Sequence, residues 1–138
     1  MTIRAAFATD EGERIIDRHF GDANFYDIYD ISENNSIFLK RITNTKSENK
    51  SELHADPEKA VNIANLLESE SVNTAAAKIF GPNIKRIRKK FVCVLVSDKY
   101  ISEAISILQD KYSEIESEWF NGENRLHLNF KKQEKNNE

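Results

Sequence analysis

The sequence predicts a single α/β domain, in which a mixed β-sheet is flanked by helices. Beyond residue 55, short apolar segments alternate with helical patterns, which is typical of parallel strands joined by right-handed crossovers. Before residue 44, two strand-like segments flank a short turn and predict an antiparallel hairpin in the same sheet. Residues 91–96, Phe-Val-Cys-Val-Leu-Val, are apolar without a break, as expected of a strand that is covered on both faces.

The first part of the chain is expected to be mostly strand. Aromatic and β-branched residues dominate 25–31, and the Asn34-Asn35 pair suits the left-handed backbone of a turn. Acidic residues around Gly12 predict another turn at 10–13. The expected strands span residues 3–8, 15–16, 25–31 and 37–43.

The middle of the chain predicts a loop, a helix and a strand. Residues 44–53 are polar and are expected to form a mobile loop. Asp56 as N-cap and Pro57 at the first helical position then begin a helix. Its apolar face is formed at helical spacing by Ala60, Ile63, Ala64 and Leu67. Residues 72–79 are expected to be a strand, although their alanines favour a helix.

Two further helices are predicted around the apolar strand 91–96. The first follows the turn Phe80-Gly81-Pro82-Asn83 and places Ile84, Ile87 and Phe91 on one side. The second follows Ser97-Asp98, and its apolar positions are Ile101, Ala104, Ile105, Leu108, Tyr112 and Ile115.

The C-terminal part is expected to be separate from the main domain, with residues 1–117 forming the domain and 118–138 an extension. Asn121-Gly122 and the alternating Leu126, Leu128 and Phe130 predict a small hairpin or an added edge strand. Residues 131–138 are expected to be disordered.

Composition narrows the class of protein. The chain has 138 residues and a formal net charge of −3, whereas general nucleic-acid binders are usually strongly basic. The single cysteine cannot form an internal disulfide or by itself hold an iron-sulfur cluster. No signal peptide is recognised, and no apolar run reaches the roughly 20 residues that span a bilayer. A cytoplasmic protein with neither nucleic acid nor membrane as partner is expected.

His19 is the first candidate for chemistry, within Arg18-His19-Phe20-Gly21-Asp22. A neutral imidazole is a good ligand for iron and other transition metals. Gly21 would let a guest come close, and Arg18 would add positive charge beside an anionic one. The alternative is a histidine that only caps a strand end by hydrogen bonding. His54 and His127 are expected to be exposed without a role, and Cys93 to be a buried apolar side chain.

The turn at Gly81-Pro82-Asn83 is the second candidate. A helix N-terminus offers unpaired N–H groups and a partial positive charge, and therefore attracts anions. Such a turn after a parallel strand also lies where ligands collect in α/β sheets. The alternative is an ordinary strand–helix turn. The basic residues at 85–90 are interpreted as a solvated helix face that could also attract an anion.

The His-Phe-Gly motif at 19–21 and the Gly-Pro at 81–82 together resemble the dinitrogenase iron-molybdenum cofactor biosynthesis family of the NifX/NafY type. The resemblance covers roughly residues 3–115 and implies an RNase H-like three-layer fold. It also implies a non-enzymatic carrier or chaperone in nitrogen fixation, which binds an iron-sulfur or iron-molybdenum cluster transiently and delivers it. The implied protein partner is a cluster-assembly protein or a metalloenzyme.

The resemblance assigns His19 as the metal contact and Gly81, Pro82 and Asn83 as the turn that meets negative charge. These groups are therefore expected to lie close together, with Arg18 or Lys78 nearby. The sequence departs from the family at Lys78 and Phe80, which replace small residues and would narrow the pocket unless Lys78 contacts an anion. A protein-interaction or regulatory domain that has lost the cluster is therefore the alternative function.

A metal-dependent nuclease of the same fold class is the third hypothesis. Such enzymes hold magnesium ions with clustered carboxylates. The acids near the first strand lie in expected turns, and none lies in the middle of that strand, which disfavours a nuclease. These acids are Asp10, Glu11, Glu13, Asp17 and Asp22.

Overall fold

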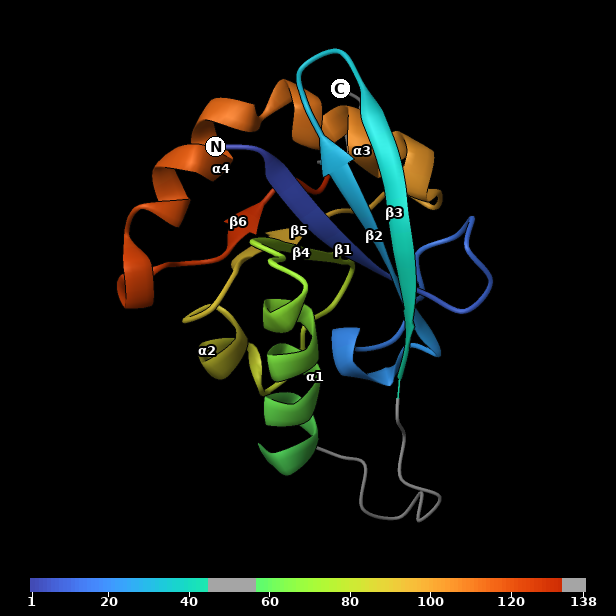
Figure 1. Ribbon diagram of the computed structural model, residues 1–138, viewed down its shortest axis with the longest axis vertical. Helices are drawn as coiled ribbons and strands as arrows, with labels where there is room; N and C mark the ends of the chain where they lie inside the picture. Colours follow the sequence, from blue (N-terminus) through green and yellow to red (C-terminus); the bar gives the residue numbers. More distant parts are fainter. Residues whose placement is uncertain (45–56, 133–138) are drawn as a thin grey trace, which may run out of the picture.

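A computed structural model describes residues 1–44 and 57–132, which form a six-stranded mixed sheet with helices on both faces (Figure 1). The strand order is β3-β2-β1-β4-β5-β6. β2 runs antiparallel to its neighbours β1 and β3, and the remaining pairs are parallel. The strands are β1 Ile3–Thr9, β2 Phe25–Ile31, β3 Ser36–Thr43, β4 Thr74–Ala77, β5 Val92–Leu95 and β6 Leu128–Asn129.

The helices complete a three-layer arrangement, which confirms the predicted RNase H-like α/β fold. α1 (Pro57–Ser69) and α2 (Ile84–Ile87) lie on one side of the sheet, and α3 (Ile101–Asp110) and α4 (Tyr112–Trp119) lie on the other (Figure 1). Two short 3-10 turns, Phe20–Asp22 and Gly122–Asn124, lie in the connections. None of the described helices is both long and apolar enough to cross a membrane.

The central strands are buried on both faces because successive side chains point to opposite sides. Ala6 and Ala8 of β1 face α1, whereas Ala5 and Phe7 face α3. β5 does the same with Cys93 on one face and Val92 and Val94 on the other, all fully buried. The apolar run 91–96 is therefore an interior strand, as predicted.

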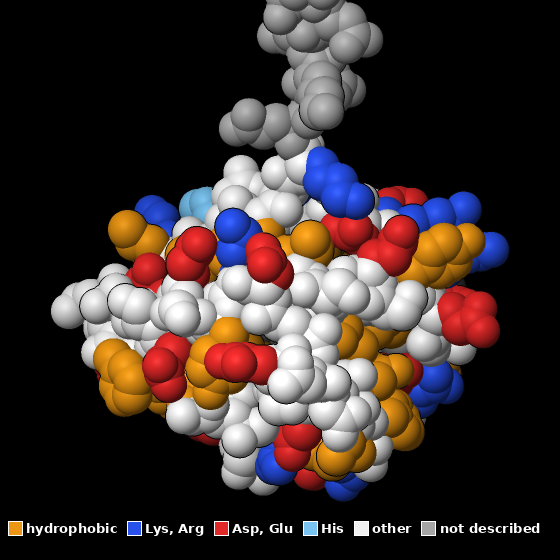
Figure 2. Space-filling model, turned by 90° about the horizontal axis from the view of Figure 1, so that it is seen from above, with side chains coloured by type: hydrophobic (Ala, Val, Ile, Leu, Met, Phe, Trp, Pro, Cys, Tyr) orange, Lys and Arg blue, Asp and Glu red, His pale blue; other side chains and the backbone are white. Residues whose placement is uncertain are grey.

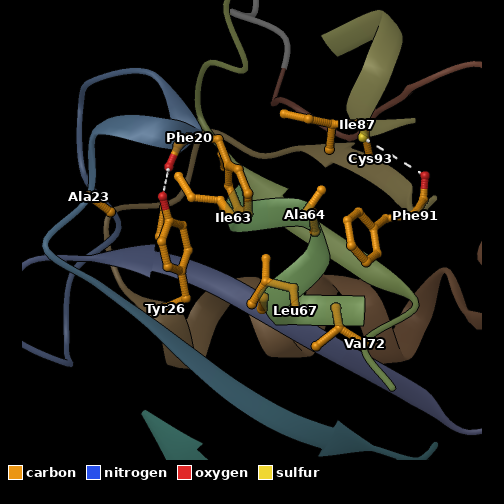
Figure 3. Close-up of a cluster of buried hydrophobic side chains, with 14 of the residues drawn as sticks. Phe20, Ala23, Tyr26, Ile63, Ala64, Leu67, Val72, Ile87, Phe91 and Cys93 are labelled. Atoms are coloured by element: carbon orange, nitrogen blue, oxygen red, sulfur yellow. Dashed lines mark hydrogen bonds between the residues drawn. The ribbon is translucent and has the colours of Figure 1, made fainter. Parts of the chain in front are cut away.

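The core on the α1 face borders the candidate site. Ile63, Ala64 and Leu67 of α1 point down onto the sheet, in agreement with the predicted apolar face (Figure 3). Phe20 and Tyr26 approach from the N-terminal segment, and the Tyr26 hydroxyl donates a 2.8 Å hydrogen bond to the Phe20 carbonyl. A buried tyrosine hydroxyl usually has such a partner.

The segment between β1 and β2 differs from the prediction, because residues 15–16 do not form a strand. Ile15 makes an isolated bridge to Thr9, and Arg14 makes another to Tyr100. The segment is instead tied to the start of α3: Ile15 N–H donates to the Lys99 carbonyl at 3.0 Å, and Ile101 N–H donates to the Glu13 carbonyl at 2.8 Å. Its two isoleucines are buried on opposite faces of the sheet.

The helices after residue 83 are shorter than predicted. α2 has a single turn, and the backbone then turns through residues 88–90 so that Phe91 enters the core. The predicted third helix is broken at Lys111, whose φ of −99° and ψ of 19° depart from helical values. The break divides it into α3 and α4, and Ile115 of α4 still packs into the core on the α3 face.

The C-terminal extension adds an edge strand rather than a hairpin, because β6 pairs parallel to β5. Lys131 and Lys132 are still held, by Asn129 and Ser97. The start of α1 at Pro57 agrees with the prediction. Most of the predicted loop 44–53, Asp56, His54, the side chain of Ala60 and residues 133–138 lie outside the described residues.

Candidate functional site

Two segments that are far apart in the sequence meet beyond the carboxyl end of β4. His19 forms an isolated parallel bridge with Ile79, and the Phe20 N–H donates a 2.8 Å hydrogen bond to the Ile79 carbonyl. Gly81 follows two residues later and lies against His19. The expected proximity of His19 and the Gly81 turn is therefore confirmed, at the edge where α/β sheets commonly bind ligands.

Gly81 is in direct contact with the imidazole of His19. A Cβ atom added at Gly81 would lie 2.8 Å from both Cγ and Nδ1 of the ring, which is closer than real Cβ atoms approach. The backbone there has a φ of +79°, a conformation that L side chains rarely adopt. Both observations require glycine at this position, and the ring of His19 rests on the main chain that follows β4.

His19 itself is exposed, whereas the residue after it is buried. The ring of Phe20 packs against Tyr26 and Phe80, with centroids 5.0 and 5.3 Å away. Phe80 is thus in the core on the α1 face and does not narrow the site; the expectation that it would do so is wrong. The cause is the alternation of side chains along a pleated segment: Ile79 points out, so Phe80 points in.

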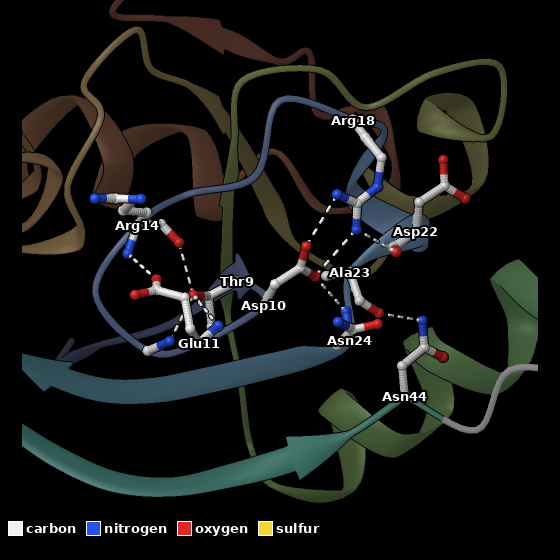
Figure 4. A network of polar contacts seen from close by, with 10 residues as sticks. Thr9, Asp10, Glu11, Arg14, Arg18, Asp22, Ala23, Asn24 and Asn44 are labelled. Atoms are coloured by element: carbon white, nitrogen blue, oxygen red, sulfur yellow. Dashed lines mark hydrogen bonds and ion pairs between the residues drawn. The ribbon is translucent and has the colours of Figure 1, made fainter.

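Arg18 is held by an ion pair on the N-terminal side of His19 (Figure 4). Its Nη1 lies 2.9 Å from Oδ2 of Asp10, and its Nη2 donates to the Asp22 carbonyl at 3.1 Å. The hydrogen bond to Asp10 and the charge of that carboxylate raise the pKa of Arg18. Asp10 also accepts the N–H of Asn24 at 2.9 Å, so this acid orders the turn that carries the site.

Lys78 is paired with an acid that lies two residues before His19 in the sequence. Its Nζ lies 2.7 Å from Oδ1 of Asp17, and the hydrogen bond and charge of Lys78 lower the pKa of that carboxyl. The Lys78 side chain is 18% exposed and that of Asp17 86% exposed. The ammonium therefore lies close to the surface of the molecule, with a partner that water surrounds.

Pro82 and Asn83 lead into α2, which has only four residues. The Asn83 side chain does not cap the helix, and the Ile84 N–H is directed to the Gly81 carbonyl at 3.3 Å. Because the macrodipole sums over aligned peptide units, a single turn supplies little of it. The predicted helix does begin after this turn, but it is too short to supply much positive charge, so any contact to an anion would depend on the local N–H groups.

Gly21 has a different environment from Gly81. The nearest atom to a Cβ added there would be Ile63 Cδ1 at 4.0 Å, which is ordinary contact. The carbonyls of Gly21 and Ala23 both accept from Nδ2 of the buried Asn44, at 3.0 and 2.7 Å (the bond to Ala23 is drawn in Figure 4). Sequence reasoning missed Asn44; its place directly after a strand, in an otherwise polar stretch, gave no signal of this clamp.

The remaining candidates behave as expected or lie elsewhere. His127 is exposed, and Cys93 is fully buried, where loss of hydration raises the pKa of its thiol to about 12. Within residues 1–44 and 57–132, no group of three or more His, Cys, Asp or Glu side chains is placed to hold a metal ion. The acids considered for a nuclease site therefore form no such cluster.

Comparison with known proteins identifies the family. The model of the dinitrogenase iron-molybdenum cofactor family matches residues 1–111. The chain belongs to this family. The match includes both segments that meet at His19 and ends at the break between α3 and α4. No curated protein matches the chain.

Proposed function

We propose that this protein is a small non-enzymatic carrier, which binds an iron-sulfur or iron-molybdenum cluster through His19 and delivers it to a metalloenzyme or an assembly partner. Membership of a cofactor-related family supports the class of guest. The observation that carries the assignment to this site is the exposed imidazole seated on the backbone of Gly81. A cytoplasmic location would suit this role.

The chemistry of transfer favours a site with few protein ligands. One imidazole nitrogen can ligate iron, while the cluster keeps its own sulfides and its remaining ligands. A single protein bond leaves the cluster exchangeable. The contact between the ring and Gly81 restricts how far the imidazole can tilt, so its orientation is set before the cluster arrives.

The charged neighbours supply a second contribution. Iron-sulfur clusters with thiolate or sulfide ligands are anionic, and Lys78 lies near the surface, directly before Ile79, whose carbonyl accepts from Phe20. Its present partner, Asp17, is almost fully exposed, and such surface pairs contribute little. An incoming anion can therefore replace Asp17 as the partner of Lys78. Arg18, which is tied to Asp10 and to a carbonyl, mainly holds the turn.

Anaerobic titration with a synthetic [4Fe–4S] cluster or with isolated iron-molybdenum cofactor tests the proposal. Binding is followed by visible absorbance and by electron paramagnetic resonance. The variant His19→Ala should bind at least tenfold more weakly, which corresponds to about 1.4 kcal/mol. His127→Ala is the matched control, because that histidine is exposed but lies near β6. Equal binding by both variants and the unaltered protein would refute His19 as the ligand.

The alternative, a regulatory or protein-interaction domain without a cluster, predicts a different outcome of the same titration. It would give no cluster-dependent absorbance with the unaltered protein. The argument for it from Phe80 no longer applies because that ring is in the core. Its remaining support is Lys78, which the variant Lys78→Ala tests: a rise in cluster binding would mean that this side chain obstructs the site.

A further inference from the structure

The outer edge of the sheet at β3 carries an unusual amount of exposed apolar surface. β3 is the terminal strand on this side and pairs only with β2 in the described sheet. Three consecutive residues of this strand, Ile37, Phe38 and Leu39, are 54%, 50% and 40% exposed. We call them the β3 triple. Large apolar side chains clustered on an edge strand usually mark a contact surface.

The side chains of the β3 triple project from both faces of the sheet at the same place along the strand. Ile37 lies opposite Asp30 and Phe38 opposite Tyr29, so their side chains point to opposite sides. The register with β2 then skips Leu39, which makes this residue a β-bulge. The Phe38 ring is held edge-on against Tyr29, with centroids 5.4 Å apart. It is therefore a fixed aromatic side chain, of the kind that commonly anchors interfaces.

The cations that follow the β3 triple each have an acidic partner within the chain. Lys40 Nζ lies 3.1 Å from Oε2 of Glu70, and Arg41 Nε lies 2.8 Å from Oδ1 of the buried Asp27. The side chains of Lys40 and Arg41 are still 50% and 37% exposed, so both cations remain accessible to a second molecule.

The turn before β3 is acidic and fixed. It contains Glu33, and the carbonyls of Ser32 and Asn35 both accept from Nε2 of Gln109 on α3, at 3.1 and 3.3 Å. One end of the β3 region thus presents an acid and amide groups, the middle presents the β3 triple, and the other end presents Lys40 and Arg41. An antiparallel second copy would set acid against base at both ends.

We propose that two copies of this protein associate through β3, antiparallel about a two-fold axis that passes beside Phe38. In this register Ile37 of one copy lies opposite Leu39 of the other, and the two Phe38 rings meet. Arg41 then faces Asn35 of the other copy, beside Glu33. Such a contact is isologous: each copy uses the same patch, and the charges of one end complement those of the other.

The size and shape of the patch set the strength of the association. Three exposed side chains and a turn bury less than the roughly 800 Å² per partner of a standard interface. The bulge at Leu39 also interrupts a regular hydrogen-bonded ladder between the copies. The dimer therefore rests on side-chain packing around Phe38 and is reversible, so its population depends on protein concentration.

Cysteine cross-linking tests the predicted axis directly. Cys93, the only cysteine of the chain, is fully buried, so any disulfide between two copies must come from the introduced surface cysteine. Phe38→Cys places two sulfurs near one another across a two-fold axis, and mild oxidation should give a disulfide-linked dimer on a non-reducing gel. Phe120→Cys is the control, because Phe120 is even more exposed, at 74%, but lies after α4.

Sedimentation velocity of the unaltered protein over about a hundredfold range of concentration supplies the second measurement. We expect the weight-average sedimentation coefficient to rise with concentration, and Phe38→Ser to weaken the association at least tenfold. Purely monomeric sedimentation throughout the range would overturn the proposal. So would equal cross-linking of the Phe38→Cys and Phe120→Cys variants, or association that Phe38→Ser leaves unchanged.

Discussion

The two segments that meet at the candidate site, 18–22 and 78–82, share a pattern of a cation, a variable residue, phenylalanine and glycine. Arg18-His19-Phe20-Gly21 runs beside Lys78-Ile79-Phe80-Gly81, with His19 and Ile79 paired. In both segments the variable residue is exposed, the phenylalanine is buried, and the cation pairs with an aspartate. The two segments are therefore equivalent in the burial of their side chains and in the pairing of their cations.

The two segments differ in the backbone conformation of the glycine and in what each glycine contacts. Gly81 has a positive φ and touches the imidazole of the other segment, whereas Gly21 has room for a side chain. Glycine is therefore sterically required at position 81, whereas position 21 has room for a larger residue. One segment supplies the candidate ligand His19, and the other supplies the backbone on which its ring rests.

Removing the shared phenylalanines should have the largest effect on stability. Phe20→Ala and Phe80→Ala each create a cavity in the core on the α1 face, and each should lower the free energy of unfolding by about 3–5 kcal/mol. Urea denaturation measures both. Leu108→Ala is the control on the α3 face: it should destabilise the protein similarly without moving the NMR resonances of His19. If either substitution lowered the free energy of unfolding by less than about 1 kcal/mol, the two phenylalanines would not be equivalent parts of the core.

The two glycines should separate clearly. Gly81→Ala should cost about 1–3 kcal/mol because it combines a positive φ with a clash against His19, and it should shift the imidazole NMR resonances. Gly21→Ala should change the free energy of unfolding by less than about 1 kcal/mol and leave those resonances in place. Equal effects of the two substitutions would show that the contact with the ring does not matter.

Cys93 reports on the core that both phenylalanines share. Its thiol has a pKa of about 12 when folded and about 9 otherwise, because burial disfavours the thiolate. The folded state therefore holds this proton more tightly, and stability should fall as pH rises from about 9 towards 12. Reaction with a thiol reagent near pH 8 should be slow in the folded protein and faster in Phe80→Ala. Rapid modification of the unaltered protein would contradict the burial.

The paired aspartates should give the smallest effect on stability and the sharpest one on binding. Asp17→Asn frees Lys78 from an exposed partner, so we expect little change in the urea midpoint but tighter binding of an anionic cluster. Asp10→Asn should instead loosen the turn, because Asp10 holds both Arg18 and the N–H of Asn24. Binding that is weaker in Asp17→Asn than in the unaltered protein would exclude Lys78 as an anion contact.

Much of the fold followed from hydrophobic periodicity. The unbroken run 91–96 and the start of the first described helix at Pro57 were predictable because local pattern and packing agree there. The one-turn α2 and the break at Lys111 were not, since both depend on how Phe91 and Ile115 reach the core. The helix propensity of a segment carries no information on where its side chains must reach the core.

The candidate site was predictable in its location but not in its details. Strand ends on the same edge of a parallel sheet meet, so the proximity of His19 and Gly81 followed from topology. The inward direction of Phe80 and the clamp by Asn44 depend on partners from other segments. The ion pairs of Arg18 with Asp10 and of Lys78 with Asp17 were missed for the same reason. Figure 2, which looks down on the α3 and α4 side, likewise shows acidic, basic and hydrophobic side chains interspersed in a way that sequence order does not reveal.

The backbone bonds of residues 13–20 determine when the site can exist during synthesis. Three of their partners lie far along the chain: the carbonyl of Ile79, the carbonyl of Lys99 and the N–H of Ile101. A ribosome releases the chain from its N-terminus, so His19 emerges long before any of these groups. A nascent chain that ends before residue 79 lacks the surface on which the imidazole rests. If the protein is the proposed carrier, a nascent chain would bind a cluster at this site only after the chain through α3 has been made.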